Sequence, residues 1–135
     1  MTFRILLLTE FDRRRTTNPR YSLRSYARSL SIDHSALSQI LRGKRRLTAR
    51  TVRALGTRLR LGPSAIDEYC AAEHETAVLA ALHRPGFRAD SRWLSSMVGI
   101  PVDDVNVTLQ RLLRKRIVSM RSQTRWVRVE EAECG

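Results

Sequence analysis

Apolar residues recur every three or four positions through the first 62 residues, which is the spacing of amphipathic helices. A first helix is expected to bury the face that carries Phe3, Leu7, Leu8 and Phe11. Asn18-Pro19 interrupts this pattern, because proline disrupts a helix interior. The spacing therefore predicts one long helix at the start of a helical segment.

Two shorter helices are expected next, each behind a polar capping residue. Ser22 precedes a helix over Leu23–Leu30, and Asp33 precedes a helix over His34–Arg42. A side-chain oxygen at such a position accepts a hydrogen bond from a free backbone N–H of the first turn. Gly43 is expected to end the second helix, because glycine readily adopts the left-handed conformation that follows a helix. The pattern is that of two helices joined by a tight turn.

A fourth helix is expected behind Thr48, and Gly62-Pro63 marks the next break in the pattern. Ser64, with Asp67 three residues later, resembles a capping box and predicts a helix that runs to about His83. Apolar residues form a long stripe on this helix. We expect that stripe to be the contact surface of a homodimer, and the alternative is a monomer that uses both modules in tandem.

The last third of the chain changes from helical to alternating periodicity. Helices are expected at residues 92–98 and 102–115, and strands at residues 117–121 and 125–129. Two helices followed by a β-hairpin are the element order of a winged helix.

Together these patterns predict a mainly α-helical protein with two domains. Residues 1–62 are expected to form a helix-turn-helix bundle, and residues 63–135 a helix followed by a winged helix with a small β-hairpin. No apolar run approaches the roughly 20 residues that a membrane span needs. We therefore expect a cytoplasmic protein without membrane contact.

Positive charge is concentrated in the first half of the chain. The 135 residues include 25 Lys+Arg and 13 Asp+Glu, for a formal net charge of +12. Residues 1–62 hold 15 of the basic and three of the acidic residues, whereas residues 63–135 hold ten of each. An arginine-favouring genome explains the abundance of arginine but not this asymmetry. A nucleic-acid partner explains it better than a merely solvated surface, since a strongly basic domain attracts a polyanion.

Few residues are placed for metal binding or catalysis. Cys70 and Cys134 lack CxxC spacing, and His34, His74 and His83 lack HxxxH spacing. The sequence also lacks a nucleophile elbow and a glycine-rich phosphate loop. We therefore expect no metal, no cofactor and no enzymatic activity.

A short helix, a tight turn and a second helix before a basic loop occupy Tyr21–Thr48, with the sequence YSLRSYARSLSIDHSALSQILRGKRRLT. This segment resembles the Cro/C1-type helix-turn-helix of bacterial and phage repressors. The matching positions are Ala27, Ile32, Asp33, Leu37, Ser38, Ile40, Arg42, Gly43, Lys44 and Thr48. Two positions depart from the family: Leu23 replaces a frequent glutamine, and Ser31 replaces the turn glycine. At Ser31 we expect a strained backbone or an altered turn.

The resemblance implies that the second helix of this segment enters the major groove of double-stranded DNA. It implies base contacts from His34, Ser35 and Gln39. Glutamine suits adenine, with which it forms two hydrogen bonds. Phosphate contacts are expected from the start of the first helix, the exposed face of the second and the basic loop: Ser22, Arg24, Ser38, Arg42, Lys44, Arg45 and Arg46. The alternative for each of these residues is a solvated side chain without a DNA contact.

The segment over residues 74–129 is similar to the C-terminal module of an uncharacterised bacterial family that joins a Cro/C1-like domain to a winged helix. The matching positions are Phe87, Asp90, Trp93, Leu94, Ile100, Val105, Leu109, Leu112 and Trp126-Val127. Asp103 and Asp104 open its second helix and would repel phosphate. Candidate DNA contacts here are Asn106, Thr108 and Gln110 for bases, and Arg111, Arg114, Arg121, Arg125 and Arg128 for phosphates. The alternative is a protein-binding module with Trp93, Trp126 and Met120 in its core or interface.

The sequence thus favours a sequence-specific, DNA-binding transcription regulator, a repressor that occupies its operator as a homodimer. The alternative is a DNA-binding antitoxin or adaptor whose C-terminal module binds another protein. RNA binding is less favoured, because Phe, Trp and Tyr make up 6% of the chain and are expected to be buried.

Overall fold

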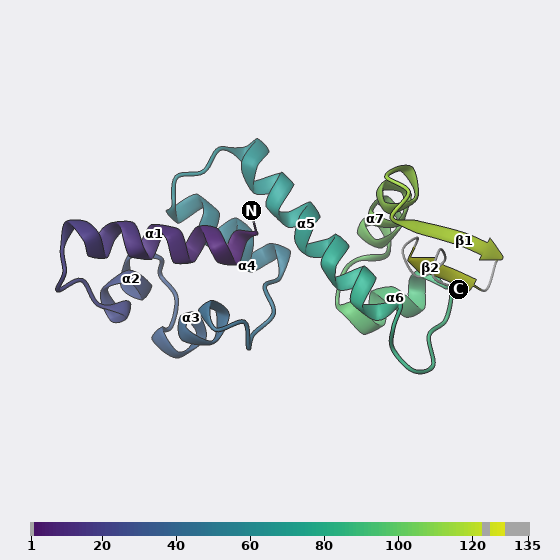
Figure 1. Cartoon of the computed structure of the whole chain (residues 1–135), viewed down its shortest axis with the longest axis horizontal. Helices are drawn as coiled ribbons and strands as arrows, with labels where there is room; N and C mark the ends of the chain where they lie inside the picture. The colour runs from purple at the N-terminus through teal and green to yellow at the C-terminus, as the bar shows by residue number, and fades with distance from the viewer. Residues whose placement is uncertain (1, 123–124, 129–135) are drawn as a thin grey trace. The chain divides into compact units, whose positions relative to one another are not determined.

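The computed structural model describes residues 2–122 and 125–128, with the backbone alone described at 121–122, 125 and 127–128. The described part is mainly α-helical, as the sequence predicts. Its helices are α1 (Phe3–Thr17), α2 (Leu23–Ser29), α3 (His34–Leu41), α4 (Ala49–Arg58), α5 (Pro63–Ala81), α6 (Ser91–Val98) and α7 (Val102–Arg114) (Figure 1). Two short strands follow, β1 (Val118–Ser122) and β2 (Arg125–Arg128). None of the described helices is long and apolar enough to cross a membrane.

The chain forms two compact units that divide between Cys70 and Ala71, within α5. We call these unit 1 and unit 2. The division lies eight residues beyond the expected break at Gly62-Pro63. The reason is that Ile66 and Cys70, in the first two turns of α5, belong to the core of unit 1.

The core of unit 1 gathers one face from each of its helices. Phe3 and Leu7 of α1 are buried as predicted, and they pack with Tyr26 of α2, Leu37 of α3 and Val52 of α4. In Figure 1, α2 and α3 lie beneath α1. The hydroxyl of Tyr26 donates to the backbone oxygen of Leu7 at 2.8 Å, which satisfies a polar group inside the core. The burial pattern follows the apolar spacing of the sequence.

The three capping residues that the sequence predicts in unit 1 are confirmed. The Ser22 hydroxyl accepts a hydrogen bond from the backbone N–H of Ser25 at 3.1 Å. The Asp33 carboxylate accepts from the N–H groups of Ser35 and Ala36, at 3.0 and 3.3 Å. The Thr48 hydroxyl accepts from the N–H of Thr51 at 3.2 Å. These bonds fix where α2, α3 and α4 begin.

Left-handed residues end α2 and α3. Ser31 has φ +53° and Gly43 has φ +73°, so the strain expected at Ser31 is present. At the end of α3, Lys44 N–H donates to Gln39 O and Gly43 N–H donates to Ile40 O, which is a Schellman motif. The turn after α2 repeats this arrangement with serine in place of glycine, at a cost of about 1 kcal/mol.

Two expectations for α5 are wrong. The helix begins at Pro63, one residue before the predicted cap Ser64, because proline suits the first helical position, where its missing N–H is not needed. Asp67 forms an ion pair with Arg53 of α4 at 2.9 Å. The apolar stripe expected to face a second copy is used within the chain instead. Ile66 and Cys70 lie in the core of unit 1, and Ala77, Val78 and Ala81 lie in the core of unit 2.

Unit 2 packs the end of α5 against α6, α7 and the two strands. Val78, Leu94, Val105 and Leu112 are buried, together with Trp126, which is 8% exposed and therefore lies in the core, one of the two places expected for it. β1 and β2 pair antiparallel, with a register shift between Met120 and Ser122. The connection between the strands lies outside the described residues.

Candidate nucleic-acid interface

The polar face of α3 is open to solvent within unit 1. Ser35 and Gln39 are exposed, as is Arg42 at the C-cap, while His34 and Ser38 are half-buried. The opposite face, with Leu37, Ile40 and Leu41, is buried in the core. The tertiary structure therefore presents as one surface the side chains that the resemblance assigns to DNA.

The loop after α3 forms a cationic rim beside this surface. Lys44, Arg45 and Arg46 are all exposed, and they follow directly after Arg42. In the described part of the chain, no carboxylate lies within salt-bridge distance of these four side chains. Their charges are therefore not neutralised by the described residues, as a surface that binds phosphate requires.

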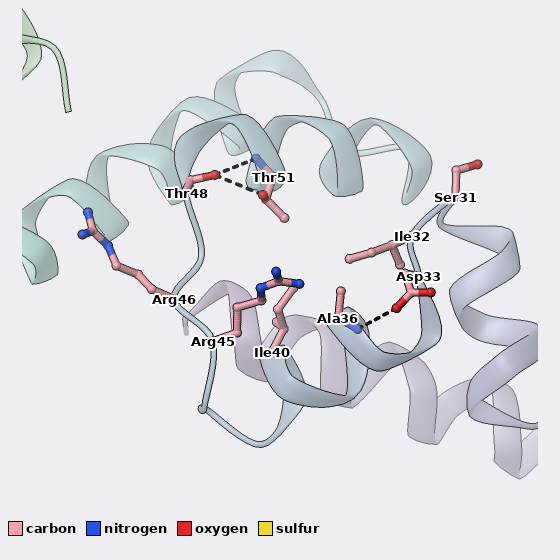
Figure 2. Close-up of a pocket in the computed structure, with 9 residues that line it drawn as sticks. All are labelled: Ser31, Ile32, Asp33, Ala36, Ile40, Arg45, Arg46, Thr48 and Thr51. Atoms are coloured by element: carbon pink, nitrogen blue, oxygen red, sulfur yellow. Dashed lines mark hydrogen bonds between the residues drawn. The ribbon is translucent and has the colours of Figure 1, made fainter. Parts of the chain in front are cut away.

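A pocket of about 520 Å³ lies between α3, this loop and α4 (Figure 2). Its apolar lining comes from Ile32, Ala36 and Ile40. Figure 2 shows the side chain of Arg45 directed into this space and the side chain of Arg46 directed away from it. The two arginines therefore present their charges in different directions from one loop.

Hydroxyl groups lie on the α4 side of the same pocket. Thr48 and Thr51 line it, and their hydroxyl oxygens share a hydrogen bond of 3.0 Å. Thr51 was not predicted as a site residue. The spacing of two threonines, one turn apart at the start of a helix, was the only sequence feature that pointed to it.

The start of α2 carries the other expected phosphate contacts. Ser22 and Arg24 are exposed, so both are accessible to a ligand. The Ser22 hydroxyl already caps α2 and shares a 3.0 Å hydrogen bond with the Ser25 hydroxyl. Either hydroxyl can donate in the Ser22–Ser25 bond, and when Ser25 donates, the Ser22 proton is left for a phosphate oxygen.

A cluster around Arg14 joins α1 to α2 within unit 1. The Arg14 guanidinium donates to Glu10, to the Tyr21 hydroxyl and to the Ser29 hydroxyl, at 2.8–3.0 Å. Hydrogen bonds from Arg13 and Arg14 lower the pKa of Glu10 to about 2, against the opposing effect of burial. The arrangement fixes α2, and with it the turn that leads to α3.

Unit 2 contains a second pair of consecutive helices, but its charges are arranged differently. Asp103 and Asp104 are exposed in the first turn of α7. Glu75 of α5 lies 3.0 Å from Lys115 and 3.8 Å from Arg111. Glu75 therefore partly neutralises the charge of Arg111, so Arg111 is less suited to contact a phosphate.

The remaining candidates in unit 2 have mixed outcomes. Arg114 is exposed, whereas the side chains of Arg121, Arg125 and Arg128 lie outside the described part of the structure. The suggested base contact from Thr108 is wrong, because Thr108 is 2% exposed and its hydroxyl donates to Asp104 O at 2.7 Å. The i+4 spacing let this hydroxyl satisfy the helix backbone inside the core.

Metal-binding geometry is not found in the described residues, where no group of three His, Cys, Asp or Glu side chains converges. No protein-family model matches the chain, and no curated protein and no solved structure is detectably similar to it. The functional argument therefore depends on the geometry and charge of the site itself.

Proposed function

We propose that this protein is a sequence-specific, DNA-binding transcription regulator of the helix-turn-helix class that represses by occupying its operator. One observation carries the proposal: the exposed polar face of α3 lies beside four cations that have no acidic partner in the described residues. An α-helix fits the major groove of B-DNA, which is about 12 Å wide. Cations at its edge would then contact the phosphates that border the groove.

The roles within this surface follow from position. Gln39 and Ser35, exposed on α3, are proposed to contact base edges together with His34. The proposed phosphate contacts come from the ends of the surface: Ser22, Arg24, Ser38, Arg42, Lys44, Arg45 and Arg46. The Arg45 guanidinium, which points between α3 and α4, would meet a phosphate at the mouth of the pocket.

Unit 2 is proposed to be a winged helix, and its surface favours a protein partner over DNA. Its elements run α6, a turn, α7 and two antiparallel strands, which supports this assignment. On α7 the exposed side chains include Asp103, Asp104 and Val107, which is 53% exposed. Acids repel phosphate, while an exposed aliphatic side chain gains from burial against protein. An adaptor or antitoxin role is therefore the second candidate function, and it also requires the DNA-binding surface of unit 1.

The decisive experiment is selection of bound fragments from random double-stranded DNA by the full chain, followed by titration of the best site. We expect a defined sequence and an affinity whose logarithm falls linearly with the logarithm of salt concentration. Spacing of the selected sites reports whether one or two copies bind, since paired half-sites lie about one helical turn apart. Selection of no sequence, together with salt-independent binding, would refute the proposal. A stoichiometric protein that co-purifies through unit 2 would favour the adaptor.

A further inference from the structure

One carbonyl at the end of α3 is satisfied by a residue from another helix. The carbonyls of Ser38, Gln39 and Ile40 accept from backbone N–H groups of the following turn. The next carbonyl, that of Leu41, accepts from the Nε of Arg4 on α1, at 3.1 Å. Arg4 thus completes the capping of α3 across 37 residues of sequence.

Gly43 forms the turn and lies directly against Arg4. Its φ of +73° favours glycine, and a Cβ at this position would lie 3.4 Å from Arg4 Nε and 3.6 Å from Arg4 Cζ. A Cβ would thus make ordinary van der Waals contact with the guanidinium, and it is the left-handed backbone that disfavours a side chain at residue 43. Arg4 and Gly43 form a joint between α1 and the loop that holds Lys44, Arg45 and Arg46.

The positive charge of Arg4 is unfavourable on its own helix and favourable at the end of α3. Arg4 is the second residue of α1, and a cation at a helix N-terminus is disfavoured by the helix dipole. The same cation is favoured at the C-terminal end of α3, whose last turn contains no basic residue of its own. The contact with α3 compensates for the unfavourable location on α1.

We infer that Arg4 is a positioning residue for DNA recognition, which rests on the proposed function of α3. By holding the last carbonyl of α3, it fixes the direction of the recognition helix and the path of the cationic loop. The helix is eight residues long, so a displacement at its C-terminal residue Leu41 moves Gln39, two residues earlier, relative to a base pair. Arg4 acts through α3 and the loop and does not itself contact DNA.

The test compares Arg4→Met, Arg4→Lys and a matched control, Arg15→Met. The methionine keeps most of the stem but removes the donor and the charge, while lysine keeps the charge without the planar fork. Arg15 is exposed on the same helix and has no hydrogen bond to α3, so Arg15→Met removes one charge elsewhere on α1.

Affinity is measured for the selected operator and for non-specific DNA, across salt concentrations and at a temperature where each variant is folded. Arg4→Met is expected to lower operator affinity by about tenfold, the value of a charge-assisted hydrogen bond, and to leave non-specific affinity nearly unchanged. The salt slope should stay at the wild-type value. Arg4→Lys should recover part of the loss, and Arg15→Met should resemble wild type.

Two outcomes would overturn the inference. Equal losses for operator and non-specific DNA, with a salt slope reduced by about one, would make Arg4 a direct phosphate contact. Lower stability with an unchanged ratio of the two affinities would make its role purely structural.

A measurement without DNA separates this inference from the proposed function. Amide hydrogen exchange of Gly43 and Lys44 should accelerate in Arg4→Met and remain at the wild-type rate in Arg15→Met. If the wild-type protein binds no DNA, the proposed function fails, and this exchange still tests whether Arg4 holds the loop. Unchanged amide exchange in Arg4→Met would refute the claim that Arg4 holds the end of α3 and the loop that follows it.

Discussion

Units 1 and 2 each contain two consecutive helices joined by a short turn, but their surfaces differ in charge. In unit 1 the second helix, α3, is followed by Lys44, Arg45 and Arg46, with no acidic partner in the described residues. In unit 2 the second helix, α7, begins with two exposed acids, and Glu75 neutralises cations near its end. The comparison shows that two similar helix pairs can carry opposite charge arrangements. The proposed function assigns DNA to unit 1 because of the cations beside α3, and not because of the helix pair alone.

The largest expected effect separates the cations of the two units. Arg45→Ala combined with Arg46→Ala should lower affinity for all DNA sequences by about tenfold per residue and reduce the salt slope by about two, because two phosphate contacts are lost. Arg111→Ala combined with Lys115→Ala should leave DNA affinity nearly unchanged, since Glu75 already pairs with both. Fluorescence-anisotropy titrations at several salt concentrations measure both pairs. Equal losses of DNA affinity in the two double variants would indicate that unit 2 also contacts DNA.

A second comparison concerns the glutamines on the two helices. Gln39→Ala should relax specificity at a single base pair, worth about 1–3 kcal/mol, because a bidentate contact to one base is removed. Gln110, exposed on α7, is the matched control, and Gln110→Ala should leave the selected sequence unchanged. Repeating the DNA selection with each variant measures this directly. Uniform weakening across all operator variants in Gln39→Ala would remove Gln39 from the base contacts.

The capping aspartates offer a smaller, matched pair of effects. Asp33 caps α3, and Asp90 caps α6 by accepting from Arg92 N–H at 3.0 Å. Each Asp→Ala variant should cost about 1 kcal/mol of stability in denaturant unfolding. Only Asp33→Ala should also weaken operator binding, because it frays the helix that is proposed to contact DNA. Loss of operator binding in Asp90→Ala would contradict the proposal that only unit 1 contacts DNA.

The last prediction concerns the acid sensitivity of unit 1. The pKa of Glu10 is lowered from 4.5 to about 2 by its hydrogen bonds from Arg13 and Arg14. A lowered folded-state pKa contributes stability that is fully present above pH 4.5 and is lost as the pH falls toward 2. Glu10→Gln should remove that part of the acid dependence. The measurement is denaturant unfolding of both proteins between pH 2 and pH 6, and parallel pH profiles would contradict it.

The sequence predicted the local features of unit 1 well. Ser22, Asp33 and Thr48 cap the helices that they were expected to cap, and Gly43 takes the left-handed conformation. Each of these features depends on a few consecutive residues, so residue type alone specifies it. The buried faces of the helices were also predicted correctly, because helical periodicity is a local pattern.

Predictions that needed a distant partner were less successful. The stripe on α5 was interpreted as a dimer surface, but two cores of the same chain use it. Thr108 was placed at a base, but the packing of unit 2 buries it. A single sequence shows whether a residue is apolar or polar. It does not show which part of the molecule packs against that residue.

The sequence by itself determined the helices, the caps of α2, α3 and α4, the apolar faces and the excess of positive charge in the first half. Only the tertiary structure decided which charges remain unpaired and which are neutralised. Arg4 meets Leu41, and Glu75 meets Lys115, across 37 and 40 residues of sequence. Such contacts depend on how the helices pack, since charge and hydrogen bonding act through space and not along the chain.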